Sequence, residues 1–168
     1  GDRSVNASVR NHTLYLSQIG GTPSVVNVHM NRLHTLQMFG DATVNGKNIK
    51  SNHLVINAGT NSRISLNGSI TLDRINTTGN AHVNLNWVKG NIVTLNTSNN
   101  SHVQLAGYIK QLRARLNNTS SLSAEYLRTQ HTWIKTQNYA QARILAINAV
   151  QAYPEDKSNI YYYKSPGL

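Results

Sequence analysis

The sequence of 168 residues predicts an all-β protein, a single parallel β-helix (solenoid) of about seven to eight coils with a period near 20 residues. Apolar and polar residues alternate in short windows such as SRISL, AHVNL and SHVQL, which is the pattern of a half-buried strand. Each window carries the same anchor, in which a small residue and a variable residue precede an aliphatic one. These aliphatic anchors recur every 18 to 20 residues, at Val44, Ile64, Val83, Val103, Leu122, Ala142 and Ile160.

Two further apolar columns accompany the anchors. One lies eight residues before each anchor, at Leu36, Ile56, Ile75, Leu95, Ala114, Ile134 and Ala152. The other follows the anchors, at Ile49, Ile70, Val88, Ile109, Leu127 and Ile147. The frame of leucine-rich repeats is absent and helical repeats need longer periods, so the repeat indicates a β-solenoid. We therefore expect coils stacked about 4.8 Å apart, with the columns pointing inward as aliphatic ladders.

The predicted elements follow in order along the chain. Residues 1–23 are expected to form an irregular first coil or an N-terminal cap. Residues 24–168 are expected to be β-helix repeats, because Ser24-Val25-Val26 fits the anchor one step before Val44. Stretches such as TGN, SNN and NNT fall where each coil must turn. Asparagine tolerates left-handed backbone dihedrals there, and amides stacked coil on coil can hydrogen-bond to one another.

The closing strand and cap are expected at 158–168. Tyr162 follows the last anchor in the inward slot that leucines hold in earlier coils. Its large ring is expected to cover a core that has no coil above it. Tyr161 and Tyr163 then point outward, and Pro166 prevents further strand pairing.

The corners and the closing strand together resemble the bacterial GIN-type domain, a family proposed to form the heads of autotransporter adhesins and of unknown function. In that family, corners of the form G-S-G-x-[IV] recur and the last strand has the form V-x-Y-x-G-x-P. Here the corners are TNS, GNA, NNS and NTS, with asparagine largely in place of glycine. The closing strand is IYYYKSP, with Lys164 at the usual glycine. The resemblance covers roughly residues 24–168 and implies a right-handed β-helix in an exported or surface-associated protein, with no catalytic residues.

The composition indicates the class of partner. Lys and Arg total 16 against 6 Asp and Glu, and the formal charge of +10 favours a polyanion. The expected partners are an acidic glycan, lipopolysaccharide or a host-surface polyanion. No recognised nucleic-acid module is visible, so a specific nucleic-acid partner is not expected.

Other features of the composition bear on location. The absence of cysteine excludes disulfides and thiolate metal sites. No apolar run reaches the roughly 18–20 residues that a membrane span needs, so no transmembrane segment is expected. The opening Gly1-Asp2-Arg3 is neither an initiator Met nor a hydrophobic targeting segment, and we interpret it as a trimmed mature form. The expected location is secreted or in the cell envelope (periplasm or outer surface) of a bacterium.

Basic residues gather late in the repeat region, at Lys110, Arg113, Arg115, Arg128, Lys135 and Arg143. We expect them to form a basic face of the β-helix that binds the polyanion. Arg115 and Lys135 occupy the same outward column in successive coils, and a regular array of charge suits a repeating polyanion. The alternative is a solvated basic surface without a ligand.

Aromatic residues are candidate ligand contacts, because tyrosine and tryptophan stack well on sugar rings. Trp87, Tyr108 and Tyr126 follow the anchor strands of successive coils and are expected on one edge. Tyr161 and Tyr163 are candidates at the closing strand. The alternative is that these rings only cover a corner of the coil.

His82 and His102 hold one outward column in adjacent coils, about 5 Å apart by strand spacing. Two imidazoles make a weak candidate site for a transition metal. Their column neighbours, Arg63 and Ser121, supply no carboxylate or imidazole as a third ligand. We therefore expect no metal and no cofactor. The alternative to a metal site is that the two histidines form a solvated polar ladder that responds to pH.

An enzyme is not expected. Carbohydrate-cleaving sites need clustered carboxylates or a basic residue with bound calcium, whereas Asp73 and Glu125 are the only acids between residues 42 and 154. The predicted function is a non-enzymatic, secreted or envelope-associated binding or adhesion module for an acidic glycan or lipopolysaccharide. The alternatives are a polysaccharide lyase that uses Arg or Lys alone, and a purely structural β-helix that assembles into a homo-oligomer.

Overall fold

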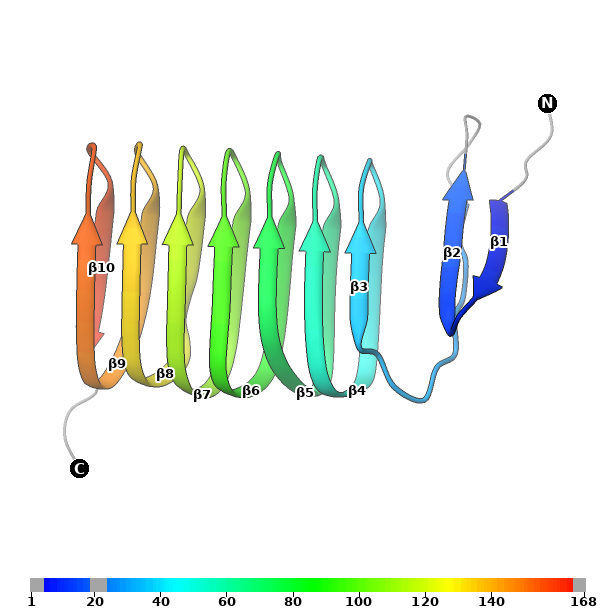
Figure 1. Ribbon diagram of the computed structural model, residues 1–168, viewed down its shortest axis with the longest axis horizontal. Helices are drawn as coiled ribbons and strands as arrows, with labels where there is room; N and C mark the ends of the chain where they lie inside the picture. Colours follow the sequence, from blue (N-terminus) through cyan, green and yellow to red (C-terminus); the bar gives the residue numbers. More distant parts are fainter. Residues whose placement is uncertain (1–4, 19–23, 165–168) are drawn as a thin grey trace. The chain divides into compact units, whose positions relative to one another are not determined.

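The computed structural model describes residues 5–18 and 24–164 (Figure 1). The described residues form strands, turns and loops without any helix, so the predicted all-β class is confirmed. The chain divides into two compact units, Gly1–Met30 and Asn31–Leu168, and each unit is described by itself.

The first unit contains a β-hairpin. Its strands, β1 (Val5–Arg10) and β2 (Thr13–Gln18), pair antiparallel. Asn11 and His12 form the two-residue turn with φ values of 48° and 60°, which is the backbone that matches the twist of paired strands. These residues form a hairpin and not a coil, and a capping role for residues 1–23 stays a prediction.

The second unit is a right-handed parallel β-solenoid of about seven turns. A long strand bends around most of each complete coil and pairs in parallel with the strands of the neighbouring coils. The strands are β3 (Thr35–Met38), β4 (Thr43–Ala58), β5 (Arg63–Thr77), β6 (His82–Thr97), β7 (His102–Leu116), β8 (Ser121–Thr136), β9 (Gln141–Pro154) and β10 (Asn159–Lys164). In Figure 1 the near side of each coil rises, the far side descends, and the coils advance to the left, which is a right-handed winding.

The parallel register confirms the predicted anchors. Val44 stands opposite Ile64, and the same column continues without a break to Ala142 and Ile160. The column eight residues before the anchors is also in register from Leu36 onward. Most of these side chains are buried, because each short aliphatic group packs on its counterpart in the next coil. The stack forms one continuous apolar core.

Asparagine and glycine build several of the tight turns that close the coils, as predicted, whereas Thr60 and the pair Asp156-Lys157 hold the left-handed positions of two others. Gly79 and Asn99 have left-handed φ values of 72° and 62°, which these two residue types adopt at low cost. The turn amides also form a ladder, in which Nδ2 of Asn80 donates to Oδ1 of Asn61 at 3.2 Å. Nδ2 of Asn100 then donates to Oδ1 of Asn80 at 2.9 Å. The ladder keeps the turns of successive coils aligned.

A second bend lies within each long strand and shifts the register. Gly68 and Gly107 lie at this bend, with φ values of 154° and 142°. A Cβ atom on Gly107 would lie 2.0 Å from the carbonyl oxygen of Val88, so only glycine fits there. The third predicted column runs through this bend, and Val88 stands opposite Gly107 instead of Ile109. That column is therefore less regular than the sequence predicts.

The solenoid begins later than predicted. No strand is present over residues 24–34, and Val25 is 88% exposed, so Ser24-Val25-Val26 is not an anchor strand. An anchor strand needs a preceding stretch of the coil, and residues 13–18, which would supply it, pair with β1. The first strand of the solenoid is β3.

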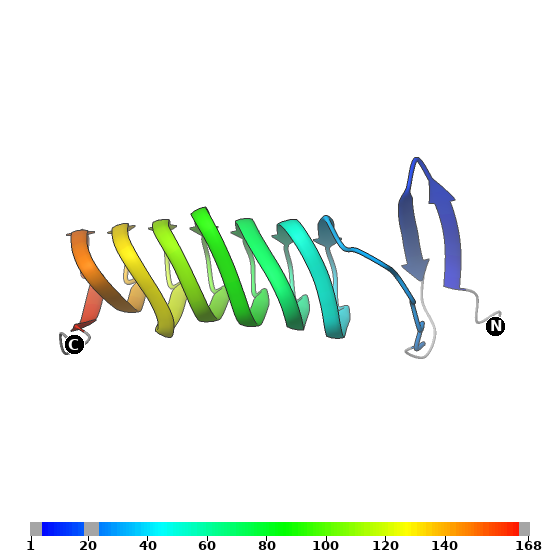
Figure 2. The same ribbon diagram turned by 90° about the horizontal axis from the view of Figure 1, so that it is seen from below.

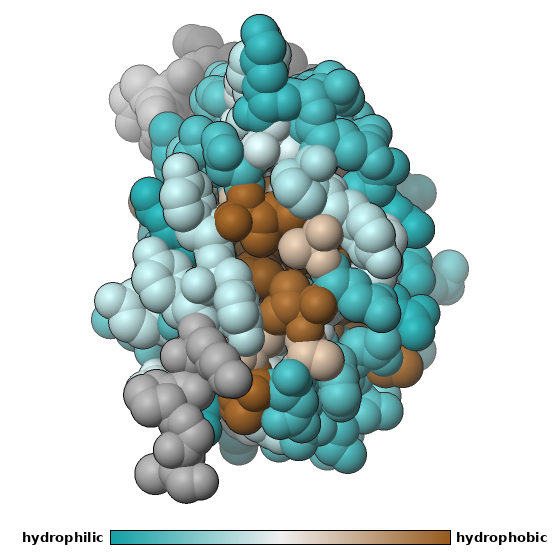
Figure 3. All heavy atoms as spheres, turned by 90° about the vertical axis from the view of Figure 1, so that its left-hand side faces the viewer, coloured by the Kyte–Doolittle hydropathy of each residue, from teal (hydrophilic) through white to brown (hydrophobic). Residues whose placement is uncertain are grey.

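At the C-terminal end, β10 pairs only with β9 within the part of the chain that the structure describes. Tyr162 stands opposite Ile144 and so takes the predicted inward slot, where it is 45% exposed because no described coil lies above it. Tyr161 and Tyr163 are exposed. Figure 3 shows apolar residues at the centre of this end and hydrophilic residues around them. Pro166 lies outside the described residues.

Candidate functional site

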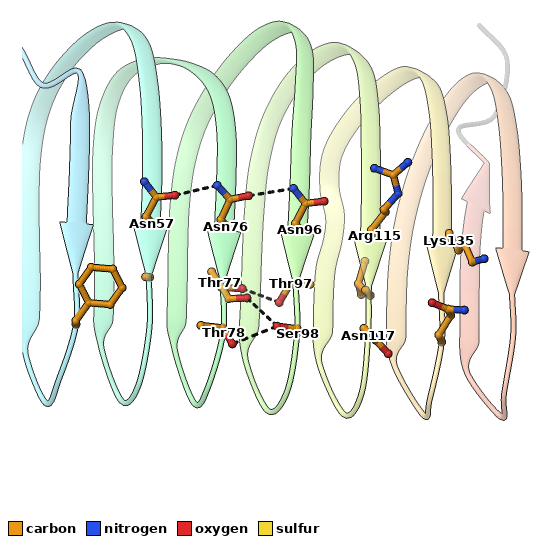
Figure 4. A pocket seen from close by; sticks show the side chains of 14 residues that line it. Asn57, Asn76, Thr77, Thr78, Asn96, Thr97, Ser98, Arg115, Asn117 and Lys135 are labelled. Atoms are coloured by element: carbon orange, nitrogen blue, oxygen red, sulfur yellow. Dashed lines mark hydrogen bonds between the residues drawn. The ribbon is translucent and has the colours of Figure 1, made fainter.

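An outward column of amides that continues into cations lies on the part of the long strands before the tight turn (Figure 4). Nδ2 of Asn76 donates to Oδ1 of Asn57 at 2.8 Å, and Nδ2 of Asn96 donates to Oδ1 of Asn76 at 3.0 Å. Arg115 and Lys135 follow Asn96 in the same register column. The predicted alignment of Arg115 with Lys135 is confirmed, and the amides extend it.

This column lines an open groove of about 570 Å³. The groove's other side is lined by polar side chains next to the tight turn, namely Thr78, Ser98, Asn117 and Gln137. The ring of Phe39 also lines it. A chain molecule lying along the groove would meet amides and hydroxyls over several coils and then the cations Arg115 and Lys135.

The two cations of the groove have different partners. The guanidinium carbon of Arg115 lies 5.1 Å from the centroid of the Trp133 ring, within the range of a cation–π contact. Trp133 in turn contacts Tyr153, with ring centroids 5.9 Å apart. Nζ of Lys135 lies 2.9 Å from Oε1 of Glu155. The hydrogen bond from Lys135 is the largest cause that lowers the pKa of Glu155 below its ordinary value.

The six predicted cations do not form one continuous face. Three lie before the tight turn, namely Arg113, Arg115 and Lys135. Two lie in the middle of their strands, namely Lys110 and Arg128. The last, Arg143, lies in the first part of β9 opposite Ser123. A coil turns fully within about 20 residues, so cations spread along it point in different directions.

The predicted aromatic contacts lie outside the groove. Trp87, Tyr108 and Tyr126 lie in the successive strands β6, β7 and β8, near the bend within each strand, and all three are exposed. Tyr161 and Tyr163 lie on β10 at the end of the solenoid. The groove instead has Trp133 and Tyr153 beside its cations.

The two predicted histidines are neighbours. His82 stands opposite His102, with ring centroids 6.0 Å apart and ring planes at 47°. Nδ1 of His102 lies 2.5 Å from Oγ of Ser121. Burial is the main cause that lowers the pKa of His102, and the charge on His82 lowers it further. Within residues 5–18 and 24–164, no group of three or more His, Cys, Asp or Glu is placed to hold a metal ion.

The two acids between residues 42 and 154 are far apart. Asp73 lies in β5 and Glu125 in β8, three coils further along. Oδ2 of Asp73 lies 3.1 Å from Nδ1 of His53. Oε2 of Glu125 is buried without a hydrogen-bond partner in the described structure. The two carboxylates therefore do not form the close pair that glycoside hydrolysis uses.

Sequence reasoning missed Phe39, which lines the groove, and Trp133, which lies beside the groove cation Arg115. The signal for Trp133 was present, because residues two apart on a strand point to the same side and Trp133 is two residues before Lys135. The signal for Phe39 was absent, because it follows the first short strand and its place depends on how the coil turns.

The profile of a family described as "Putative auto-transporter adhesin, head GIN domain" matches residues 2–166. The chain belongs to this family. The GIN domain therefore includes the hairpin unit as well as the solenoid. No curated protein and no solved structure matches this GIN domain in the comparisons. Its described residues contain no helix long and apolar enough to cross a membrane.

Proposed function

We propose that this GIN domain is a non-enzymatic adhesion module, secreted or held in the bacterial envelope, that binds acidic glycans in the groove. The observation that carries the proposal is the column in which hydrogen-bonded amides continue into Arg115 and Lys135. The family description as the head of an adhesin supports adhesion at a surface. The formal charge of +10 supports an anionic ligand.

The groove suits a polymer that carries both hydroxyl and acid groups. Coils stack about 4.8 Å apart, so contacts recur at a regular interval along a bound chain. The amides of Asn57, Asn76 and Asn96 can donate to and accept from sugar hydroxyls. The guanidinium of Arg115 can bind a carboxylate or sulfate through two parallel hydrogen bonds.

The surroundings of the two cations indicate which of them makes the main contact with an anionic ligand. Lys135 is paired with Glu155, so an acidic ligand must compete with that carboxylate. Arg115 has an aromatic ring beside it instead of an acid, and keeps its full charge for the ligand. We therefore assign the main anion contact to Arg115, with Trp133 available to stack on a sugar ring.

A charge-matched pair of variants tests the groove. Binding to immobilised heparin and to lipopolysaccharide is measured at about 0.15 M salt, where surface charges are screened beyond about 8 Å. Arg115→Ala/Lys135→Ala is expected to weaken binding about tenfold. The control Arg63→Ala/Arg143→Ala removes the same charge elsewhere on the solenoid and is expected to cost less than about threefold.

Three outcomes would contradict the proposal. Equal losses in the two double variants would show that net charge, and not the groove, attracts the ligand. No binding of the unmodified chain to an array of acidic glycans would reject the ligand class. Release of unsaturated sugars from an acidic polysaccharide would indicate a lyase.

The C-terminal end favours a second candidate function, assembly into a homo-oligomer. Within the described chain, β10 has an unpaired edge, and apolar residues lie at the centre of that end (Figure 3). Unpaired edges readily pair with other chains. Light scattering from micromolar to millimolar concentration tests this candidate, and a constant monomer mass would reject it.

A further inference from the structure

Trp87 has a backbone conformation that its residue type rarely adopts. Its φ is 62°, in the left-handed region, where a bulky side chain is strained. Other coils have Asn48, Gly68 and Gly107 at positive φ near the same bend. In β6 the strained position holds a tryptophan that is 74% exposed. The fold gains little from a large ring in solvent, so the strain and exposure together indicate a role in binding.

Tyr126 has a similar place two coils later. It is 71% exposed and stands opposite Ala106 of the intervening coil. That coil has only the small residues Ala106 and Gly107 at the bend. Figure 2 shows the bends of successive coils side by side. The backbones that carry Trp87 and Tyr126 are therefore about 10 Å apart, with Ala106 in the coil between them and Tyr108 two residues further along that coil.

Cations accompany these rings. Lys89, Tyr108 and Arg128 form one register column across β6, β7 and β8, and all three are exposed. The hydroxyl of Tyr108 accepts a hydrogen bond from Nε2 of Gln130 at 2.6 Å, which holds the ring in place. The surface therefore combines three aromatic rings with two positive charges.

We propose that Trp87, Tyr108, Tyr126, Lys89 and Arg128, here called the aromatic bend, form a second binding site for acidic glycans. The rings of Trp87 and Tyr126 stack on the faces of sugar units. Lys89 and Arg128 bind the carboxylate or sulfate groups. The ligand class rests on the proposed function, but the residues differ from those of the groove, so the two sites can fail separately.

Exposed tryptophan, tyrosine and cations are also typical of surfaces that contact anionic membranes. The aromatic bend favours a glycan because the amides of Asn86, Asn91 and Gln130 lie in the same parts of the strands. Amides offer hydrogen bonds that sugar hydroxyls can use and lipid chains cannot.

Fluorescence can separate the two sites, because the chain has 2 tryptophans and each belongs to one site. Trp133→Phe leaves Trp87 as the sole tryptophan, and Trp87→Phe leaves Trp133. Each variant is titrated with heparin and hyaluronan hexasaccharides at about 0.15 M salt. A saturable change in Trp87 emission is expected. It should need about tenfold more ligand after Lys89→Ala/Arg128→Ala, and should be unaffected by Arg115→Ala/Lys135→Ala.

Each result decides between the sites. A response from Trp133 alone would overturn the aromatic bend and leave the groove standing, and a response from Trp87 alone would do the reverse. No change in the emission of either tryptophan on titration would overturn both sites. A response of Trp87 to phosphatidylglycerol vesicles but to neither hexasaccharide would overturn the aromatic bend in favour of a membrane contact. Glycine suits the left-handed backbone of position 87, so Trp87→Gly is expected to keep the melting temperature. The same variant is expected to lose binding at the aromatic bend.

Discussion

The guanidinium of Arg115 lies over the ring of Trp133, which belongs to the next coil, at 5.1 Å from the ring centroid. Trp133→Leu removes this contact and keeps an apolar side chain. It is expected to weaken heparin hexasaccharide binding about two- to tenfold, because Arg115 without the ring beside it must be ordered on binding, at a cost of about 0.5–1.5 kcal/mol. Isothermal titration calorimetry measures the change. Trp133→Phe is the control that retains a ring, and equal losses in the two variants would contradict the role of the aromatic face.

Gly107→Ala is expected to destabilise the solenoid. Its Cβ would lie 2.0 Å from the carbonyl oxygen of Val88, and the residue has a φ of 142°. We expect a loss of about 2–3 kcal/mol in the free energy of unfolding, measured by urea denaturation. Gly40→Ala is the control, because a Cβ there meets nothing within 4 Å and only the φ of 87° opposes it. A loss of about 1 kcal/mol is expected for the control, and similar losses in both would argue against the close approach.

Trp87→Gly is expected to leave the stability unchanged or to raise it by up to about 1 kcal/mol. Glycine relieves the left-handed strain of Trp87, while the greater freedom of glycine in the unfolded chain offsets part of the gain. Tyr126→Gly, at a position without a left-handed φ, is expected to cost about 1 kcal/mol. Thermal unfolding distinguishes the two variants. A clear loss of stability in Trp87→Gly would show that the indole packs in the fold.

Tyr162→Ala is expected to lower the stability by about 1–2 kcal/mol. Tyr162 stands opposite Ile144 in the inward column, but it is 45% exposed, so the cost is below that of a fully buried aromatic residue. Tyr161→Ala, from the outward side of the same strand, is expected to cost less than about 0.5 kcal/mol. Equal melting temperatures for Tyr162→Ala and the unmodified chain would show that the Tyr162 ring does not cover the core at the last coil.

His102 is expected to make the fold sensitive to acid. Burial is the largest cause of its lowered pKa, and His82 and Arg143 lower it further while Glu125 opposes them. The folded chain binds this proton less readily than the unfolded chain. The contribution of His102 to stability is thus present above pH 6.5, its unperturbed pKa, and is lost as the pH falls through the lowered pKa.

Melting temperatures between pH 8 and pH 5 test this expectation, over the range in which histidines titrate. The unmodified chain should lose more stability towards pH 5 than His102→Gln does. In His82→Gln, the pKa of His102, followed by NMR, should rise because a like charge is removed. Identical pH profiles for the unmodified chain and His102→Gln would exclude His102 as the sensor.

The repeat could be predicted from the sequence because residues one period apart stand opposite one another in neighbouring coils of the solenoid. The anchors and the column of Arg115 and Lys135 follow from counting alone, and the register confirms them. The slot of Tyr162 follows in the same way. Counting succeeds wherever the strand is straight, since every second residue then faces the core.

Counting fails where the strand bends. At the bulge near Trp87, two residues of one strand face one of the next, so side-chain direction no longer follows from sequence distance. This is why Lys110 and Arg128 do not join the face of Arg115. The left-handed φ of Trp87 also cannot be derived from residue type, because a tryptophan does not favour it. The hairpin at the N-terminus was missed because its turn, Asn11-His12, lacks the glycine that usually signals such a turn.

The amide ladders bond each coil only to the coils directly before and after it. A unit of 19 or 20 residues could therefore be lost or duplicated while the flanking coils keep their contacts. In the proposed binding groove, the number of such units between Asn57 and Lys135 sets how long a glycan must be to reach from the amides to the cations. The loss or duplication of one unit would change that length by the spacing of one coil, about 4.8 Å.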